Sequence, residues 1–566
     1  MSETTNTNTS TSTTATAAAA SAVAEKTTKS AGPLLDVRDL AVSYRDGAIS
    51  AVRDVSFTVG AGEVVAIVGE SGSGKSTTAL SVMGLLPDRA RIDRGSIEFD
   101  GRRIDRLPET ALRALRGGLI GLVPQDPTVS LDPTQRVGHQ IAEALVVHGR
   151  RTRRTAWERA VEILGEAGVD DPARRARQYP HEFSGGMRQR VLIGIAWACR
   201  PRLIIADEPT SALDVTVQKQ VLDRLDELIA DAGTAVVLVT HDLGVAAERA
   251  QRVVVMSQGR VVESGPSAQV LTDPQEDYTR RLLNSLPTRR THRATARRRP
   301  AAEPGGTPLV VARGLVKEFH TRDDAGRSQV FTAVGGIDLE INRGETLSVV
   351  GESGSGKTTT ARMVMCLEKP TGGTVEFDGV DTGSLKPAEL RQLRRRFQIV
   401  HQNPYASLSP RLSLAQIVEE PMKAFGIGDR RERRERAGEL LERVGLPASY
   451  GSRRAAELSG GQRQRVAIAR ALALKPDLVV CDEPVSALDV TVQAQVLDLL
   501  AELQDSLGLS YLFISHDLTV VRAISDRVAV MRKGEVVEVG TVEDVFERPQ
   551  HDYTRTLLDA VPEGAA

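Results

Sequence analysis

The chain has 566 residues, more than one compact core requires, and at about 100–200 residues per domain it corresponds to roughly three or four packing units. Its 73 basic and 74 acidic residues give a net charge of −1, which excludes a whole-molecule field that would attract nucleic acid or an anionic membrane. The three cysteines, Cys199, Cys366 and Cys481, lie far apart in the sequence. Their spacing is neither that of a disulfide framework nor that of a zinc or iron–sulfur site, and it favours a reducing, cytosolic compartment.

The N-terminal residues 1–33 are rich in Thr, Ser and Ala. They contain neither the basic region nor the Leu-rich region of a signal peptide, so we expect a disordered tail. No stretch approaches the about 18–20 apolar residues that span a bilayer. If the protein works at a membrane, we expect other chains to supply the spans.

An internal repeat organises the rest of the chain. The sequence GESGSGKS at Gly69–Ser76 returns as GESGSGKT at Gly351–Thr358, and later landmarks repeat in constant register. This repeat predicts two homologous domains, 34–287 and 308–563. The segment 288–307, an arginine cluster followed by Pro and Gly, is the predicted linker. Its arginines could contact anionic lipid, but a solvated connector is the favoured interpretation.

Short β-branched runs alternate with segments of helical period in each half, which indicates an α/β fold with a parallel sheet. In the helical segment Thr155–Gly168, the spacing places Trp157, Val161, Leu164 and Ala167 on one face. Arg/Glu-rich segments such as Arg430–Gly445 are also helical in pattern. They predict a helical subdomain inserted into each half. The predicted strands are Val64–Val68, Leu203–Ala206, Thr346–Val350 and Leu478–Cys481.

Two phosphate-binding loops follow from the pattern strand, Gly-x-x-x-x-Gly-Lys-Ser/Thr, helix. The glycines allow consecutive backbone N–H groups to close around phosphate oxygens, and Lys75 or Lys357 reaches the β- and γ-phosphates. Ser76 and Thr358 are placed to ligate Mg²⁺. The residues of these loops that we expect to bind nucleotide are Gly69, Gly72, Gly74, Lys75, Ser76 and Thr77 in the first half and Gly351, Gly354, Gly356, Lys357, Thr358 and Thr359 in the second.

Further acidic residues follow two later strands. Asp207-Glu208 and Asp482-Glu483 each end an apolar run, where the aspartate can hold Mg²⁺ and the glutamate can polarise an attacking water. A solvated strand end is the alternative for either pair alone, but both recur at the same place in each half. His241 and His516 end the next apolar strand and are candidates to sense the γ-phosphate.

A Ser-Gly-Gly motif opens an apolar helix in each half, at Ser184, Gly185 and Gly186 and at Ser459, Gly460 and Gly461. A serine hydroxyl and free N–H groups at a helix N-terminus form an anion site. Since each half already has a phosphate loop, we expect this second site to close over nucleotide that the other half holds. A plain N-cap serine would explain the helix start but not the repeated spacing before Asp-Glu.

Together these motifs resemble the ATP-binding component of an ABC transporter in which two P-loop NTPase domains are fused, and the resemblance covers about 510 of the 566 residues. It implies ATP and Mg²⁺ as cofactors, catalytic glutamates at Glu208 and Glu483 and switch histidines at His241 and His516. It also implies Q-loop residues and metal ligands at Gln125 and Gln402, joined in the metal site by Ser76, Asp207, Thr358 and Asp482. Tyr44 and Phe319 would stack on adenine. Met187 departs from the usual glutamine of the Ser-Gly-Gly motif.

A narrower resemblance is to the peptide/nickel importer subfamily. It rests on Gln402–Arg411, Asp482–Val490, and the closing segments Pro274–Thr279 and Pro549–Thr554. It implies an import ATPase bound peripherally to the cytoplasmic face of the cell membrane, with two integral-membrane permease subunits and an extracellular solute-binding protein. No nucleic acid and no homodimer would be required. Peptides, glutathione and nickel chelates stay open as solutes. The absence of a cysteine cluster near the end of either half argues against an iron–sulfur cluster.

Two other classes share these motifs. Soluble twin-ATPase translation factors of the ribosome resemble the chain, but they carry a long charged helical linker, whereas the predicted linker is short and contains Pro and Gly. DNA-repair ATPases of the same superfamily resemble it less because they carry zinc-binding cysteine clusters.

Overall fold

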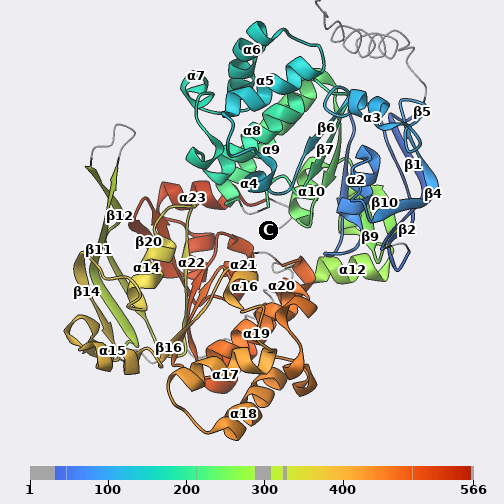
Figure 1. Cartoon of the computed structure of the whole chain (residues 1–566). Coiled ribbons are helices and arrows are strands. Elements are labelled where there is room, and N and C mark those ends of the chain that lie inside the picture. Colours follow the sequence, from blue (N-terminus) through green and yellow to red (C-terminus); the bar gives the residue numbers. More distant parts are fainter. Residues whose placement is uncertain are drawn as a thin grey trace, which may run out of the picture. The chain divides into compact units, whose positions relative to one another are not determined.

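The computed structural model describes residues 32–45, 47–211, 213–286, 307–322, 328–486 and 488–562. The described residues divide between two compact units: those up to Leu213 together with Gln220–Arg281, and Asp214–Lys219 together with those from Leu282 onward (Figure 1). Almost all of the predicted tail 1–33 and of the predicted linker 288–307 lies outside the described residues. Those two assignments and the domain boundaries stay predictions.

The first unit is built on a sheet of ten strands in the order β5-β4-β1-β2-β10-β9-β3-β8-β7-β6. Strands β6, β7, β8, β3 and β9 are parallel, as predicted. Strands β1, β2, β4 and β5 form an antiparallel region that the sequence pattern did not predict. The strands are β1 (Leu35–Tyr44), β2 (Ile49–Val59), β3 (Val64–Val68), β4 (Ala90–Phe99), β5 (Arg102–Arg103), β6 (Ile120–Val123), β7 (Leu203–Asp207), β8 (Ala235–Val239), β9 (Arg252–Ser257) and β10 (Arg260–Pro266).

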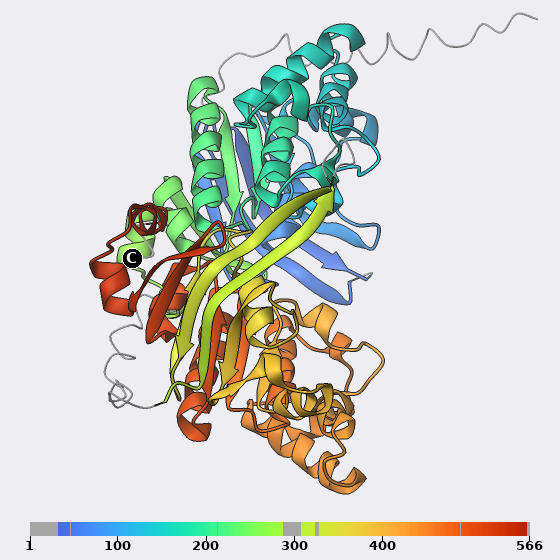
Figure 2. The ribbon, with the colours of Figure 1, turned by 90° about the vertical axis from the view of Figure 1, so that its left-hand side faces the viewer.

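The second unit repeats this plan with two sheets, β16-β17-β18-β13-β19-β20 and β12-β11-β14-β15. Its antiparallel sheet contains the long hairpin β11–β12, which is the yellow-green pair of strands in Figure 2. The strands are β11 (Val310–Arg322), β12 (Ser328–Ile341), β13 (Thr346–Val350), β14 (Gly372–Phe377), β15 (Val380–Asp381), β16 (Phe397–Val400), β17 (Leu478–Asp482), β18 (Ser510–Ile514), β19 (Arg527–Arg532) and β20 (Glu535–Thr541).

Helices cover these sheets and also form the predicted insertions. In the first half they are α2 (Lys75–Met83), α3 (Glu109–Leu115), α4 (Pro127–Ser130), α5 (Val137–Val147), α6 (Arg153–Glu166), α7 (Pro172–Arg175), α8 (Gly185–Trp197), α9 (Val215–Ala232), α10 (Leu243–Arg249), α11 (Ser267–Thr272) and α12 (Asp277–Asn284). In the second they are α14 (Lys357–Val364), α15 (Pro387–Leu393), α16 (Pro404–Ser407), α17 (Leu414–Ala424), α18 (Arg430–Arg443), α19 (Gly460–Leu472), α20 (Val490–Leu507), α21 (Leu518–Ile524), α22 (Val542–Glu547) and α23 (Asp552–Leu558). Among the helices of the described ranges, none combines the length and the apolar character that crossing a bilayer would need.

The insertion of the first half consists mainly of α5, α6 and α8, which pack around their own apolar core. The predicted face of α6 is only partly correct. Leu164 and Ala167 are buried as expected, but Trp157 and Val161 are only half-buried, and the alanines Ala156 and Ala160 are buried in their place. Helix α6 packs against both α5 and α8, and small alanine side chains allow this close approach. The bulky Trp157 instead lies at the margin, with its ring centroid 4.9 Å from that of His139.

Each phosphate loop follows a fully buried strand of its sheet. All five residues of β3 and all five of β13 are buried, because both faces of these central strands are covered. Strand β3 is apolar throughout and β13 is rich in β-branched residues, and both end directly at a glycine, which makes them recognisable in the sequence. The rigid strand therefore fixes the point at which each loop begins.

Candidate functional site

The backbone of each phosphate loop has a shape that requires glycine. Gly69 has φ +146° and Gly351 has φ +147°. A Cβ atom at these positions would lie 2.1 Å from the carbonyl oxygen of Met256 or of Met531. Gly72, Gly74, Gly354 and Gly356 also have positive φ, and the helices α2 and α14 begin directly after Gly74 and Gly356. The predicted sequence of strand, glycine loop and helix is therefore present in both halves.

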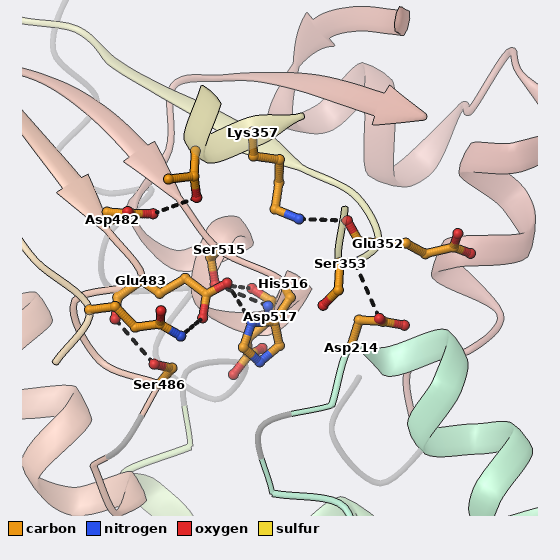
Figure 3. A network of polar contacts seen from close by, with 12 residues as sticks. Asp214, Glu352, Ser353, Lys357, Asp482, Glu483, Ser486, Ser515, His516 and Asp517 are labelled. Carbon is orange, nitrogen blue, oxygen red and sulfur yellow. Dashed lines mark hydrogen bonds and ion pairs between the residues drawn. The ribbon is translucent and has the colours of Figure 1, made fainter. Parts of the chain in front are cut away.

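A buried lysine lies inside each loop. Lys75 Nζ donates to the carbonyl oxygens of Gly69 (2.7 Å) and Glu70 (3.0 Å). Lys357 Nζ makes the same bonds to Gly351 (2.7 Å) and Glu352 (2.8 Å), as Figure 3 shows for Glu352. Burial lowers the pKa of Lys357 despite the acidic groups around it. Each ammonium group is thus held at the loop by backbone oxygens that phosphate oxygens can replace.

A hydroxyl and a carboxylate meet beside each loop. Ser76 Oγ donates to Asp207 Oδ1 at 3.0 Å, and Thr358 Oγ1 donates to Asp482 Oδ1 at 3.3 Å. Burial raises the pKa of both aspartates. A cation at this position would favour their charged form. Hydroxyl and carboxylate oxygens are ligands that Mg²⁺ prefers, so these residues fit the ion that the sequence predicts.

The two glutamates that follow the aspartates each contact a glutamine and a histidine. Gln125 Nε2 donates to Glu208 Oε2 at 2.7 Å, and His241 Nδ1 lies 3.3 Å from Oε1 of the same carboxylate. In the second half, Gln402 Nε2 donates to Glu483 at 2.7 Å and His516 Nδ1 lies 3.1 Å from it (Figure 3). The predicted Gln, Glu and His therefore come together in each half.

These contacts shift the pKa of both partners. Burial alone would raise the pKa of Glu208 and Glu483, but the bonds and positive charges of the histidines and lysines hold it below the usual range. Burial alone would lower the pKa of His241 and His516, but their glutamate partners raise it. Each site therefore favours a carboxylate beside an imidazolium.

The backbone of the glutamates is strained. Glu208 has φ +47° and Glu483 has φ +46°, a left-handed conformation that costs a side-chain-bearing residue about 1–2 kcal/mol. The Glu208 N–H donates to Val239 O and the Glu483 N–H donates to Ile514 O, on the neighbouring strand. Strain of this kind is typical of functional sites.

The Ser-Gly-Gly motifs lie at the start of α8 and α19. Ser184 Oγ caps α8 by accepting from the N–H of Met187 at 3.4 Å, and Ser459 Oγ accepts from the N–H of Gln462 at the same distance. In turn, the Ser459 N–H donates to the side-chain oxygen of Gln462 at 3.1 Å. The side chain of Met187 has no amide oxygen to accept such a bond, so the first half lacks this reciprocal bond. Gly185, Gly186, Gly460 and Gly461 form the first turns. Their meeting with the other half's nucleotide stays a prediction.

The two predicted adenine-stacking residues have different surroundings. The Tyr44 hydroxyl lies 3.1 Å from Thr77 Oγ1 on the helix that follows the phosphate loop. The Phe319 ring is 37% exposed and has Lys317 Nζ 5.1 Å from its centroid. Directly opposite it on β12 lies Phe331, which is 54% exposed. Sequence reasoning missed Phe331 because its place opposite Phe319 depends on the strand register.

A second feature that sequence reasoning missed is a tyrosine behind each loop. The Tyr278 hydroxyl accepts a bond from the N–H of Glu70 at 3.4 Å, and the Tyr553 hydroxyl accepts one from the N–H of Glu352 at 3.2 Å. The repeated Asp-Tyr-Thr sequence was a signal for this pair. On its own, the motif supports only the resemblance to the importer subfamily.

Comparison with known proteins places this geometry in a family. The family model described as "ABC transporter" matches residues 52–211 and 334–486. The model described as "Oligopeptide/dipeptide transporter, C-terminal region" matches residues 262–322 and 537–566. The chain therefore belongs to the ABC transporter family, and it is an ATP-binding subunit that couples ATP hydrolysis to transport. The two cassettes confirm the predicted tandem α/β fold.

Several similar proteins match this chain along nearly their whole length. The chain is 45% identical to the oligopeptide transport ATP-binding protein OppD of Mycobacterium tuberculosis over an alignment of 605 positions, gaps included. This alignment covers 94% of this chain and 98% of the relative. It is 46% identical to the peptidoglycan transport ATP-binding protein YejF of Agrobacterium fabrum over 535 residues, 93% and 96% of the two chains. It is 42% identical to the glutathione import ATP-binding protein GsiA of Escherichia coli over 560 residues, 94% and 90%. These similarities favour a transporter over the ribosomal and DNA-repair alternatives.

Proposed function

We propose that this chain energises the import of small solutes that contain peptide bonds, such as oligopeptides, glutathione or peptidoglycan fragments. The observation that carries the proposal is the oligopeptide/dipeptide C-terminal region at the end of both halves. The cassette alone is weaker support, because one fold serves many functions. The relatives named for oligopeptide, peptidoglycan and glutathione transport support the same class of solute. Nickel chelates are a less favoured alternative.

The partners in this proposal are two integral-membrane permease subunits and an extracellular solute-binding protein that delivers the solute to them. The chain itself would lie peripherally on the cytoplasmic face of the membrane. It carries two phosphate loops, Gly69–Ser76 and Gly351–Thr358, so a single copy would supply both ATP sites without a homodimer. No nucleic acid takes part.

ATP would bind first through its phosphates. Lys75 and Lys357 would exchange their bonds to loop carbonyl oxygens for bonds to the β- and γ-phosphates. The hydroxyls of Ser76 and Thr358 and the carboxylates of Asp207 and Asp482 would hold Mg²⁺, with Gln125 and Gln402 completing the set. Mg²⁺, when bound, neutralises charge on the phosphates. Tyr44 and Phe319 would stack on the base.

Hydrolysis would depend on the glutamates. The low pKa of Glu208 and Glu483 keeps them as carboxylates that can accept a proton from water. The histidines beside them would hold each carboxylate in place and contact the γ-phosphate. Ser184 and Ser459, with the N–H groups that follow, would bind the phosphates of the nucleotide that the other half holds.

Uptake by cells tests the solute class. In a strain of the native organism that lacks this chain, we expect uptake of labelled tripeptides to fall, and the wild-type chain to restore it. A chain with Lys75→Ala and Lys357→Ala, present at the same level, should not restore uptake. Normal tripeptide uptake in the deletion strain, together with loss of nickel accumulation, would move the proposal to the alternative solute.

A further inference from the structure

Each half ends in a segment that returns to its own phosphate loop. We define the C-terminal brace as residues 263–280 in the first half and 538–555 in the second. It runs from strand β10 or β20 through α11 or α22 into the start of α12 or α23. Each brace lies within the region that matches the oligopeptide/dipeptide transporter model. The family match assigns no task to any residue of the brace.

The brace contacts the loop through one hydroxyl. The Tyr553 hydroxyl accepts the N–H of Glu352 at 3.2 Å, while the carbonyl of the same Glu352 accepts Lys357 Nζ at 2.8 Å. Glu352 is therefore held by its backbone between the tyrosine and the lysine. In the first half, Tyr278 and Lys75 hold Glu70 in the same way, at 3.4 and 3.0 Å.

The tyrosine is itself fixed by its surroundings. The Tyr553 side chain lies in an apolar core with Val350, the last residue of β13, and Leu557. The guanidinium of Arg532 lies 4.7 Å from the centre of its ring. Because these contacts hold the hydroxyl in a defined position, its bond to Glu352 restrains the position of the loop.

Polar bonds hold the chain just before the tyrosine. The Glu538 carboxylate accepts the N–H groups of Gln550 at 2.8 Å and of His551 at 3.1 Å. Arg555 donates to the carbonyl oxygens of Pro549 and Gln550, both at 3.2 Å. Bonds from ionised groups such as these are stronger than those between neutral groups.

The first half repeats this arrangement bond for bond. Glu263 accepts the N–H groups of Gln275 (2.8 Å) and Glu276 (3.3 Å). Arg280 donates to the carbonyl oxygens of Pro274 (3.1 Å) and Gln275 (2.8 Å). The two braces differ in sequence, yet they form the same contacts.

We infer that Tyr278 and Tyr553 are positioning residues of the two phosphate loops. Each hydroxyl fixes the second residue of its loop, so that the later N–H groups and the lysine keep the curvature that a triphosphate requires. The inference rests on the proposed role of these loops in ATP binding. A brace of this kind also makes the nucleotide site depend on the end of each half.

Tyr553→Phe in the full-length chain tests this role because it removes only the hydroxyl and leaves the Glu352 N–H without its partner. Hydrogen–deuterium exchange without nucleotide reports directly on the loop, and peptides of the two loops differ in mass through their flanking residues. We expect exchange at the loop 351–358 to be about fivefold to tenfold faster. The KM for ATP should rise by about the same factor, with kcat changed less than about twofold, because Tyr553 does not touch the reacting atoms.

Tyr511→Phe is the matched control. The Tyr511 hydroxyl is buried in the same unit and donates to Leu500 O at 2.9 Å, so its loss removes a bond of similar kind elsewhere. This control should leave exchange of the loop and the KM unchanged. Glu538→Gln, which weakens the brace without touching the tyrosine, should produce a smaller change in the same direction as Tyr553→Phe.

Two results would overturn the inference. One is loop exchange and KM for Tyr553→Phe equal to the wild type. The other is an equal change in Tyr511→Phe, which would mean that the loop only reports lower overall stability. If the wild-type chain bound no ATP, the proposed function would fail, whereas the exchange measurement would still decide whether the hydroxyl orders the loop.

Discussion

The Gln402 side-chain amide donates a 2.7 Å hydrogen bond to the carboxylate of Glu483. The two residues follow β16 and β17, which are neighbouring parallel strands. Gln125 and Glu208 repeat the bond at 2.7 Å after β6 and β7. Since each glutamine also begins the segment that leads into the helical insertion, the position of the insertion and the orientation of the glutamate are linked through one hydrogen bond.

Replacing both glutamines tests this link through the pH dependence of ATP hydrolysis. The amide bond favours the charged form of the glutamate, so Gln125→Leu with Gln402→Leu should raise the pKa of Glu208 and Glu483. We expect the acid limb of the kcat/KM profile to move to higher pH. Gln398→Leu is the control, because Gln398 donates to backbone carbonyls of Arg394 and Phe397 instead. An acid limb that does not move would contradict the proposed link.

The role of the glutamates as bases has a direct test. Glu208→Gln with Glu483→Gln keeps the shape of both side chains but removes the group that accepts a proton from water. Hydrolysis should fall about 10²–10⁴-fold while ATP binding is retained. The measurements are steady-state phosphate release and equilibrium ATP binding. Glu502→Gln, on an exposed face of α20, is the control. Turnover near the wild-type rate in the double variant would show that another group is the base.

The Glu483–His516 pair predicts how stability depends on pH. The pKa of His516 is raised above its ordinary 6.5, so its contribution is complete below pH about 6.5 and is lost as the pH rises through the raised value. The pKa of Glu483 is lowered below 4.5, so its contribution is complete above pH about 4.5 and is lost as the pH falls through the lowered value. The pair therefore stabilises the chain most between about pH 4.5 and 6.5.

His516→Gln should accordingly lower the melting temperature most within that window, and the difference from the wild type should shrink at alkaline pH. The measurement is thermal unfolding from pH 5 to 9, where Glu483 stays ionised. His181→Gln, which changes an exposed histidine, serves as control. A difference that grows with rising pH would mean that the pair does not form as an ion pair.

The parts of the fold that could be predicted are those with a local sequence signal. Val64–Val68 is an uninterrupted apolar run, Thr346–Val350 is rich in β-branched residues, and each precedes a glycine loop; the observed strand bounds are identical to the predicted ones. The helix Arg430–Arg443 also follows its pattern closely. The antiparallel strands β1, β2 and β4 were not predicted, because their half-buried pattern acquires meaning only through pairing with distant strands.

The same distinction applies to the site. The proximity of the Gln, Glu and His residues could be predicted because each follows a parallel strand at the same place in both halves. The carboxyl ends of such strands share one edge of the sheet. Phe331 and Tyr553 could not, because each depends on contacts between segments that no local pattern links. Trp157 shows what helical period cannot predict. The period does not say on which sides of α6 its neighbours α5 and α8 lie, and therefore not which side chains are buried.

The last prediction concerns the glycine that begins each loop. Gly351→Ala would place a Cβ atom 2.1 Å from the carbonyl oxygen of Met531, which belongs to the neighbouring strand β19. Neither group can move far, because β13 and β19 are paired and every residue from Val528 to Met531 is buried. We expect loss of ATP binding at the second loop, measured by equilibrium binding in a chain whose first loop carries Lys75→Ala.

Gly379→Ala separates this clash from the cost of the backbone conformation. Gly379 also has positive φ, +75°, but a Cβ atom there would meet nothing within 4 Å. It should therefore lower stability by only about 1 kcal/mol and leave ATP binding unchanged. If Gly351→Ala bound ATP as tightly as Gly379→Ala does, the loop would have room to shift away from β19. The carbonyl of Met531 would then not define the start of the phosphate loop.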